Sequence, residues 1–309
     1  MIPRARLVTV ILGGGAVPAP DAPTGLTATP ASTTQINLAW TDNATNETGY
    51  KVYRSTNGVD YSELDDIAVN SVTYNDTTIS AGTLYYYKVS AYNGGGESDL
   101  SGAAAALVLQ PNAASGLETQ IQDTAPTYNF GISALFRAGQ FTGTTIKIRG
   151  LLKFSDISLL PANATINSAQ VKLNCETEAS TTDRNVAIHR ALTQWFEGAK
   201  DTAVPDVGQD GSTWNLRNAN GSVAWAGGAG GGSGSDYTAA ATDTVLITAP
   251  GVFTWNVAAD VQDFVDGAAT NHGWWLIGDQ VNADSGKRFT ASDGATPANR
   301  PILMVSVNP

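Results

Sequence analysis

Few side chains in this chain of 309 residues could perform acid–base or nucleophilic chemistry, because it has two histidines and one cysteine. His189 lies in an alternating, strand-like run and is interpreted as a half-buried structural residue. His272, between Asn271 and Gly273, is typical of a turn. Cys175 is expected to pack as a small hydrophobic residue without a disulfide. Because no Gly-x-Ser-x-Gly or His-Glu-x-x-His string occurs, we predict that the chain is not an enzyme.

Oxygen ligands for a metal ion are most concentrated in the run Asp206–Ser212. Carboxylate and carbonyl oxygens are the ligands that Ca²⁺ prefers, but this run lacks the full spacing of an EF-hand loop. Asp123 and Asp260 could add carboxylates to a site in the same domain. Acidic turn chemistry is the simpler interpretation. We therefore expect no cofactor and no metal site, with Ca²⁺ kept as an alternative.

Aromatic side chains are the remaining candidates for ligand binding. Sugar rings present apolar C–H faces that stack on aromatic rings, while nearby polar groups bind the hydroxyls. Two tryptophans and a tyrosine lie in or beside turn-rich and glycine-rich insertions, and adjacent Trp274 and Trp275 cannot both face inward in one strand. Packing of the insertions, or burial against another subunit, is the alternative. The glycan platform predicted here consists of Trp214, Trp225, Tyr237 and Trp274.

The charge balance excludes two classes of partner. The chain carries 28 acidic and 17 basic residues, a formal net charge of −11 at pH 7. Nucleic acids and anionic membrane surfaces both favour clustered Lys and Arg, so neither is expected as a partner. No stretch approaches the roughly 18 apolar residues that span a bilayer. Abundant Gly, Thr and Asn, without long charged helical runs, predict an all-β protein.

The first 17 residues differ from the rest because they contain two arginines and no acidic residue. Their apolar run, residues 7–12, is short for a signal peptide, and no clean small-x-small cleavage site follows, so we expect the segment to be retained. The run has strand propensity and could add a strand to a partner's sheet edge. We predict an assembly arm, residues 1–17, whose principal residues are Arg4, Arg6, Leu7, Val8, Val10 and Ile11.

The elements of residues 18–110 are short alternating strands. The runs Ile36–Thr41, Gly49–Ser55 and Thr83–Asn93 each place apolar residues at every second position. With the opening Pro23–Ala28, this order resembles a fibronectin type III domain. The resemblance implies an immunoglobulin-like sandwich in which Trp40 is the core tryptophan. It also implies that Tyr85 is the corner tyrosine, whose hydroxyl bonds to the backbone.

A small, polar, proline-containing linker over residues 111–117 separates this domain from a second one, residues 118–309. Strands are expected at 144–154, 165–176, 185–191, 251–257, 273–278 and 302–307. A short amphipathic helix is expected at 258–265. The glycine-rich stretch 227–235 is expected to be loop that cannot pack a core.

Several strings in the second domain occur in the order found in the DNRLRE family. They are Tyr128–Gly131, Leu151–Ser155, Thr193–Gly198 and Arg300–Leu303. The domain resembles that family, which implies a jelly-roll-like sandwich of the kind found in surface, cell-wall and carbohydrate-active proteins and in phage virions. Ser155 stands where the family has Asp, and the glycine-rich insertion is untypical of it.

Two functions follow as expectations. The first is a non-enzymatic structural or display protein of a phage virion, namely a capsid decoration protein, a head fibre or a tail-associated protein. Its arm would bind other virion proteins, it would form a homo-oligomer or multicopy assembly, and it could contact host glycans. The alternative is a secreted or surface bacterial protein that binds carbohydrate and mediates adhesion. A cleavable leader would distinguish the second from the first.

Overall fold

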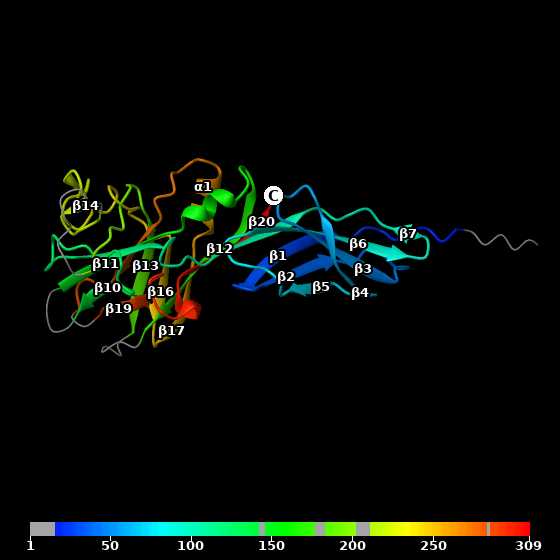
Figure 1. Cartoon of the computed structure of the whole chain (residues 1–309), viewed down its shortest axis with the longest axis horizontal. Coiled ribbons are helices and arrows are strands. Elements are labelled where there is room, and N and C mark those ends of the chain that lie inside the picture. The colour runs from blue at the N-terminus through cyan, green and yellow to red at the C-terminus, as the bar shows by residue number, and fades with distance from the viewer. Residues whose placement is uncertain (1–15, 142–145, 177–182, 202–210, 283–284) are drawn as a thin grey trace, which may run out of the picture.

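The structure is a computed structural model that describes residues 16–141, 146–176, 183–201, 211–282 and 285–309. The described chain is built almost entirely of β-strands, which confirms the all-β prediction. Two sandwiches lie one after the other along the long axis of the molecule (Figure 1). Within the described residues, no helix has the length and apolar character needed to cross a membrane.

The N-terminal sandwich has two sheets packed over a core that contains Trp40 and Tyr50, whose ring centroids are 5.8 Å apart. Alternating burial along β2 contributes Ile36, Leu38 and Trp40 to this core, as the period-2 pattern predicted. One sheet contains β1 (Thr24–Ser32), β2 (Gln35–Thr41) and β5 (Thr73–Asp76). The other contains β4 (Ser62–Ala68), β3 (Gly49–Ser55), β6 (Leu84–Asn93), β8 (Ala104–Leu109) and, beside β6, β7 (Gly96–Glu97).

The hydroxyl groups of two tyrosines of β6 form hydrogen bonds, and that of Tyr85 forms the bond expected of a corner tyrosine. The hydroxyl of Tyr85 accepts a hydrogen bond from the backbone N–H of Ser80 at 3.1 Å, which confirms Tyr85 as a corner tyrosine. Tyr87 donates to the fully buried carboxylate of Asp76 at 2.8 Å. Arg54 donates to the same carboxylate, also at 2.8 Å. This network joins the two sheets of the sandwich.

The second sandwich places its main core between two further sheets. β10 (Leu135–Phe141) joins them, because it pairs with β19 (Lys287–Thr290) and then with β11. The first sheet contains β16 (Asp243–Ile247), β13 (Arg184–Arg190), β18 (Trp274–Gly278), β11 (Ile146–Lys153) and β9 (Leu117–Gln122). The second contains β17 (Gly251–Asn256), β12 (Thr165–Cys175) and β20 (Ile302–Asn308).

The helix α1 (Ala258–Val265) has the bounds predicted from the sequence. Its Val261 is fully buried in the main core, whereas Asp260 accepts a hydrogen bond from the Trp274 indole at 2.7 Å. Arg190 forms ion pairs with Asp260 and Asp263. Each of the six predicted strands is also present, with ends that differ by one or two residues. Short elements fill the connections: η1 (Ser155–Leu159), β14 (Leu216–Asn218), β15 (Val223–Ala224) and η2 (Pro297–Asn299).

One continuous sheet joins the two sandwiches. β8, the last strand of the N-terminal sandwich, pairs antiparallel with β20, the last strand of the chain, from Leu109 opposite Leu303 to Ala105 opposite Val307. Alternate residues of both strands face different cores. Leu107 and Val305 lie in the core of the second sandwich, whereas Met304 lies in the core of the first. The boundary at residues 111–117 therefore separates the sandwiches in sequence only.

Candidate functional site

Three of the four residues predicted to form a glycan platform are buried. Trp225, Tyr237 and Trp274 are 2%, 8% and 0% exposed. The platform prediction is wrong for these three, because a buried ring offers no face to a sugar. Trp214 is partly exposed. Trp274 also lies apart from the other three, in the main core between the sheets, with Phe264 of α1 packed against it at 5.6 Å between ring centroids.

The aromatic residue that points away from the main core is Trp275, its neighbour in β18. Trp275 packs with Trp225 and Tyr237 at centroid separations of 4.8 and 5.2 Å. Trp195 belongs to the same cluster, which covers the outer face of the first sheet. The prediction that the two adjacent tryptophans face opposite ways is confirmed. Both are nevertheless fully buried, because the insertions cover Trp275.

The glycine-rich insertion is that cover, so the prediction that it cannot pack a core is wrong. Gly230 and Gly231 are buried with positive φ angles of 84° and 77°. A Cβ on Gly230 would lie 2.5 Å from the Trp214 ring, and one on Gly231 would lie 2.4 Å from the Trp275 ring. Absence of side chains therefore allows the backbone itself to pack on the two indoles.

A buried carboxylate holds this cover in place. Asp236 is fully buried and accepts backbone hydrogen bonds from Ala226, Gly227 and Gly232 at 2.9, 2.7 and 2.8 Å. It also accepts a hydrogen bond from the Thr193 hydroxyl at 3.1 Å. These bonds satisfy donors that the loop would otherwise bury without partners. Asp236 is therefore structural.

Arg149 occupies the space beside the cover. Its guanidinium donates to the carbonyls of Gly230 and Gly231 at 2.7 and 2.8 Å and lies 5.4 Å from the Trp214 ring centroid. Burial lowers the pKa of the guanidinium. Arg149 and Gly230 thus pack against the one platform residue that is not buried, and the four predicted aromatics do not form one surface.

The remaining predicted site residues give no site in the described chain. Arg4, Arg6, Leu7, Val8, Val10 and Ile11 lie outside the described residues, as does most of the run Asp206–Ser212. Asp123 accepts a backbone hydrogen bond from Lys147, and Asp260 is held by Trp274 and Thr242. Within the described ranges, no cluster of three or more His, Cys, Asp or Glu side chains could hold a metal ion.

Two neighbouring carboxyl groups have strongly altered acidity. Burial raises the pKa of Glu118 to about 7 and that of Glu197 to about 8, and the charge of Asp293 raises both further. Glu118 is 2% exposed and accepts a hydrogen bond from the Ser292 hydroxyl at 2.6 Å. Glu197 accepts one from the backbone N–H of Glu118 at 3.0 Å. Raised carboxyl pKa values are common in catalytic sites, but here Glu118 is closed off from solvent.

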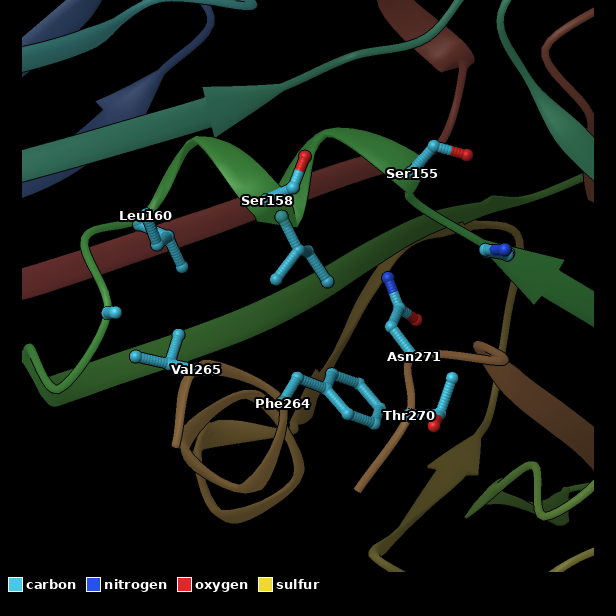
Figure 2. Close-up of a pocket in the computed structure, with 10 residues that line it drawn as sticks. Ser155, Ser158, Leu160, Phe264, Val265, Thr270 and Asn271 are labelled. Carbon is cyan, nitrogen blue, oxygen red and sulfur yellow. The ribbon is translucent and has the colours of Figure 1, made fainter. Parts of the chain in front are cut away.

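An open groove lies between α1 and η1, with a volume of about 400 Å³. Figure 2 shows Ser155, Ser158 and Leu160 on one side and Phe264 and Val265, at the end of α1, on the other. Thr270 and Asn271 close a third side. The floor is apolar, because Ile157, Leu160, Phe264 and Val265 contribute carbon atoms. The groove has the size of a small-ligand site.

The polar rim of the groove is unoccupied by partners from the described chain. No hydrogen bond or ion pair joins the side chains of Ser155, Ser158, Thr270 or Lys153 to another described residue. Burial alone lowers the pKa of the half-buried Lys153 ammonium, and no carboxylate opposes it. Asn271 is fixed, since its amide donates to the carbonyl of Phe154 at 2.9 Å. An apolar floor with free donors at its rim suits a hydroxyl-rich ligand.

Sequence reasoning missed this groove. Its lining comes from three separate segments, residues 153–162, 264–265 and 270–271. The string Leu151–Ser155 overlaps the first of them, but it indicates a fold rather than a ligand site. The one available signal was Phe264, which the predicted helix placed on its apolar face. Two serines of η1 gave no signal, because nothing in the sequence shows that α1 packs beside them.

The geometry of the N-terminal sandwich defines its class, and the comparison with known families agrees. The model of the family described as Fibronectin type III domain matches residues 21–106. Residues 21–106 therefore form a fibronectin type III domain.

Comparison with individual proteins gives matches that cover less than half of this chain. The chain is 33% identical over 134 residues to Exoglucanase B of Cellulomonas fimi, a match that covers 41% of this chain and 11% of that protein. This chain thus spans about a tenth of the length of that relative. Among solved structures, a Fn3-like protein from Clostridium thermocellum is 39% identical, covering 28% of this chain and 91% of that one at a TM-score of 0.26. A β-1,2-glucanase from Parabacteroides distasonis is 28% identical, with coverages of 28% and 12% and a TM-score of 0.25.

Proposed function

We propose that this chain is a non-enzymatic display and adhesion protein that associates with polysaccharide through the groove beside α1. The observation that carries the proposal is the combination of an apolar floor and an unpartnered polar rim in that groove. Similarity to Exoglucanase B over 134 residues supports an association with carbohydrates.

Sugar binding fits the chemistry of the groove in two ways. The half-exposed ring of Phe264 and the side chain of Val265 can contact the apolar face of a pyranose. Lys153 and the hydroxyls of Ser155, Ser158 and Thr270 can donate to, or exchange hydrogen bonds with, sugar hydroxyls. Because these groups have no described protein partner to lose, binding leaves no buried donor unsatisfied.

Absence of catalysis is part of the proposal. The two carboxyl groups with strongly raised pKa values, Glu118 and Glu197, do not line the groove, and Glu118 is buried. His272 has a pKa lowered first by burial and then by the charges of Lys153 and Arg217, but its ring does not line the groove either. A general acid or base must reach the bond that reacts.

We also infer that the second sandwich is a DNRLRE-type module. Two of the sequence strings that resemble the family, Tyr128–Gly131 and Thr193–Gly198, contact each other in the structure, which supports this inference. The Asn129 amide donates to the carbonyl of Glu197 at 2.6 Å, and a Cβ on Gly198 would lie 2.4 Å from the Asn129 side chain. Position 198 must therefore be glycine, because a side chain there would overlap that of Asn129.

Placement in a phage virion is a finer proposal, in which the arm binds other virion proteins. Its support is the position of Pro18, which follows the predicted arm in the sequence. Asn93 donates to the carbonyl of Pro18 at 2.9 Å, next to β7, at the end of the molecule farthest from the second sandwich (Figure 1). An anchor there would project the groove outward. Deletion of residues 1–17 is expected to abolish attachment to isolated particles without altering folding; full attachment of the truncated protein would contradict the placement.

Affinity gel electrophoresis tests polysaccharide binding directly. Native gels would contain one soluble polymer each: a β-1,4-glucan, a β-1,3-glucan, an α-1,4-glucan or a polyuronate. We expect retardation by at least one polymer, with binding about tenfold weaker, or ~1.4 kcal/mol, for Lys153→Ala and for Ser158→Trp. Lys147→Ala is the matched control, because Lys147 is an exposed lysine on the same strand. Equal retardation of all variants, or none by any polymer, would contradict the proposal.

A further inference from the structure

A second hollow, of about 200 Å³, lies at the junction of the two sandwiches. Ala81 and Gly82 line it from the fibronectin type III domain, and Phe154–Asp156 line it from the second sandwich. Residues of the connection between the sandwiches complete it, namely Gln110, Pro111, Asn112 and Ser115. This hollow exists only because both sandwiches are present.

The two hollows meet at one residue. Ser155, at the start of η1, lines both the groove beside α1 and the hollow at the junction. Ser155 is exposed and its hydroxyl has no described partner. The two hollows are therefore adjacent at this residue, with Phe264 and Val265 in one and Gly82 in the other.

Several contacts hold the junction in one geometry. β8 pairs with β20, the Gly82 N–H donates to the carbonyl of Val108 at 2.8 Å, and the Gln110 amide donates to the carbonyl of Pro297 at 2.9 Å. The connection itself is a turn, closed by a hydrogen bond from the N–H of Gly116 to the carbonyl of Asn112 at 2.6 Å. A continuous sheet restricts motion of the two sandwiches relative to each other, so a site between them is preformed.

We propose that the two hollows form one site for an extended polysaccharide chain, to which the fibronectin type III domain contributes the end at Ala81 and Gly82. This inference rests on the proposed function, since it extends the same groove. The ligand class follows from the shape: two adjacent hollows accommodate several consecutive sugar units, whereas one hollow accommodates the end of a chain. The junction part is rich in amides, hydroxyls and the exposed carboxylate of Asp156, which can bind sugar hydroxyls.

Titration calorimetry with two- and six-unit oligomers of a β-1,4-glucan and of a polyuronate tests the inference on the full chain. The six-unit oligomer of the binding polymer is expected to bind about tenfold more tightly than the two-unit one. Asp156→Trp should fill the junction hollow and remove this advantage, leaving the two-unit affinity unchanged. Leu159→Trp is the matched control, because Leu159 is exposed on the same short helix but lines neither hollow.

Gly82→Asn is a second test from the other sandwich. Gly82 has φ +83°, a conformation that Asn tolerates, and an added Cβ would meet no atom within 4 Å. The variant should fold and again reduce only the six-unit affinity. If six-unit binding persists unchanged in Asp156→Trp and Gly82→Asn, the junction is not part of the site, and the groove proposal still stands. If none of the four polymers retards the unaltered chain in native gels, the proposed function and this inference both fail.

Discussion

Met304, in the last strand of the chain, lies opposite Val108 in the last strand of the fibronectin type III domain, and both side chains lie in that domain's core. The neighbours of Met304 in β20, Leu303 and Val305, face the other way, into the core of the second sandwich. One strand therefore contributes to two hydrophobic cores. Stability of the first 110 residues depends on residues almost 200 positions later in the sequence.

Truncation of Met304 is predicted to weaken the fibronectin type III domain. Met304 is 5% exposed, and loss of a buried methionine side chain costs about 2–5 kcal/mol. Hydrogen exchange in Met304→Ala should accelerate for the amides of β2 as well as for those of β20. Exchange that accelerates only in the second sandwich would show that the two cores unfold independently.

Contact between Gly231 and Trp275 gives a prediction with a closely matched control. Gly231 and Gly234 have similar φ angles, 77° and 75°, so alanine causes comparable backbone strain at both. Only at Gly231 would the new Cβ overlap a ring, that of Trp275 at 2.4 Å. The midpoint of thermal unfolding should fall clearly further for Gly231→Ala than for Gly234→Ala. Equal falls would mean that the glycine-rich cover does not pack on Trp275 in solution.

Stability is predicted to decrease as the pH rises from 6.5 to 9. The folded-state pKa values, about 7 for Glu118 and about 8 for Glu197, exceed the value of roughly 4.3 for an unfolded glutamate. The folded state therefore holds these protons more tightly, so their stabilising effect is complete below the unfolded pKa and is lost as the pH passes the folded values. For Glu118 alone the part of the loss that falls between pH 6.5 and 9 is roughly 1 kcal/mol, because the rest falls between the unfolded pKa and pH 6.5.

Chemical unfolding of the unaltered chain and of Glu118→Gln, followed across this pH range, checks the prediction. Glutamine keeps the shape of the protonated acid but cannot ionise, so the variant should lose less stability between pH 6.5 and 9. The lowered pKa of His272 has its effect below pH 6.5 and does not enter this window. Identical pH profiles for the two proteins would mean that Glu118 is not buried as the structure has it.

Local pattern predicted the elements of this fold well. The spacing of apolar residues predicted the helix over residues 258–265, whereas the resemblance to fibronectin type III domains predicted the core position of Trp40 and the corner role of Tyr85. Pairing of β8 with β20 could not be predicted, because it joins strands about 200 residues apart whose alternating patterns fit many partners. Nothing in either strand shows that its two faces enter different cores.

Composition was misleading for the candidate site. A run of glycines between residues 227 and 234 is typical of solvated loop, yet Asp236 and the rings of Trp214 and Trp275 make it a packed cover. The same cover buries Trp225 and Tyr237, which the sequence had offered as ligand contacts. The groove that replaced them depends on how α1 packs beside η1, and this is a tertiary relationship without a local sequence pattern.

Hydroxyl-radical footprinting is the most direct measurement of where the chain binds sugar. It uses the polysaccharide that retards the chain in native gels. Phe264 in the groove and Trp214 beside the cover are both partly exposed aromatic side chains, so both react with the radical in the free protein. The account predicts that saturating polysaccharide protects Phe264 from oxidation and leaves the oxidation of Trp214 unchanged. Protection of Trp214 without protection of Phe264 would place the ligand on the insertions and contradict the groove as the binding site.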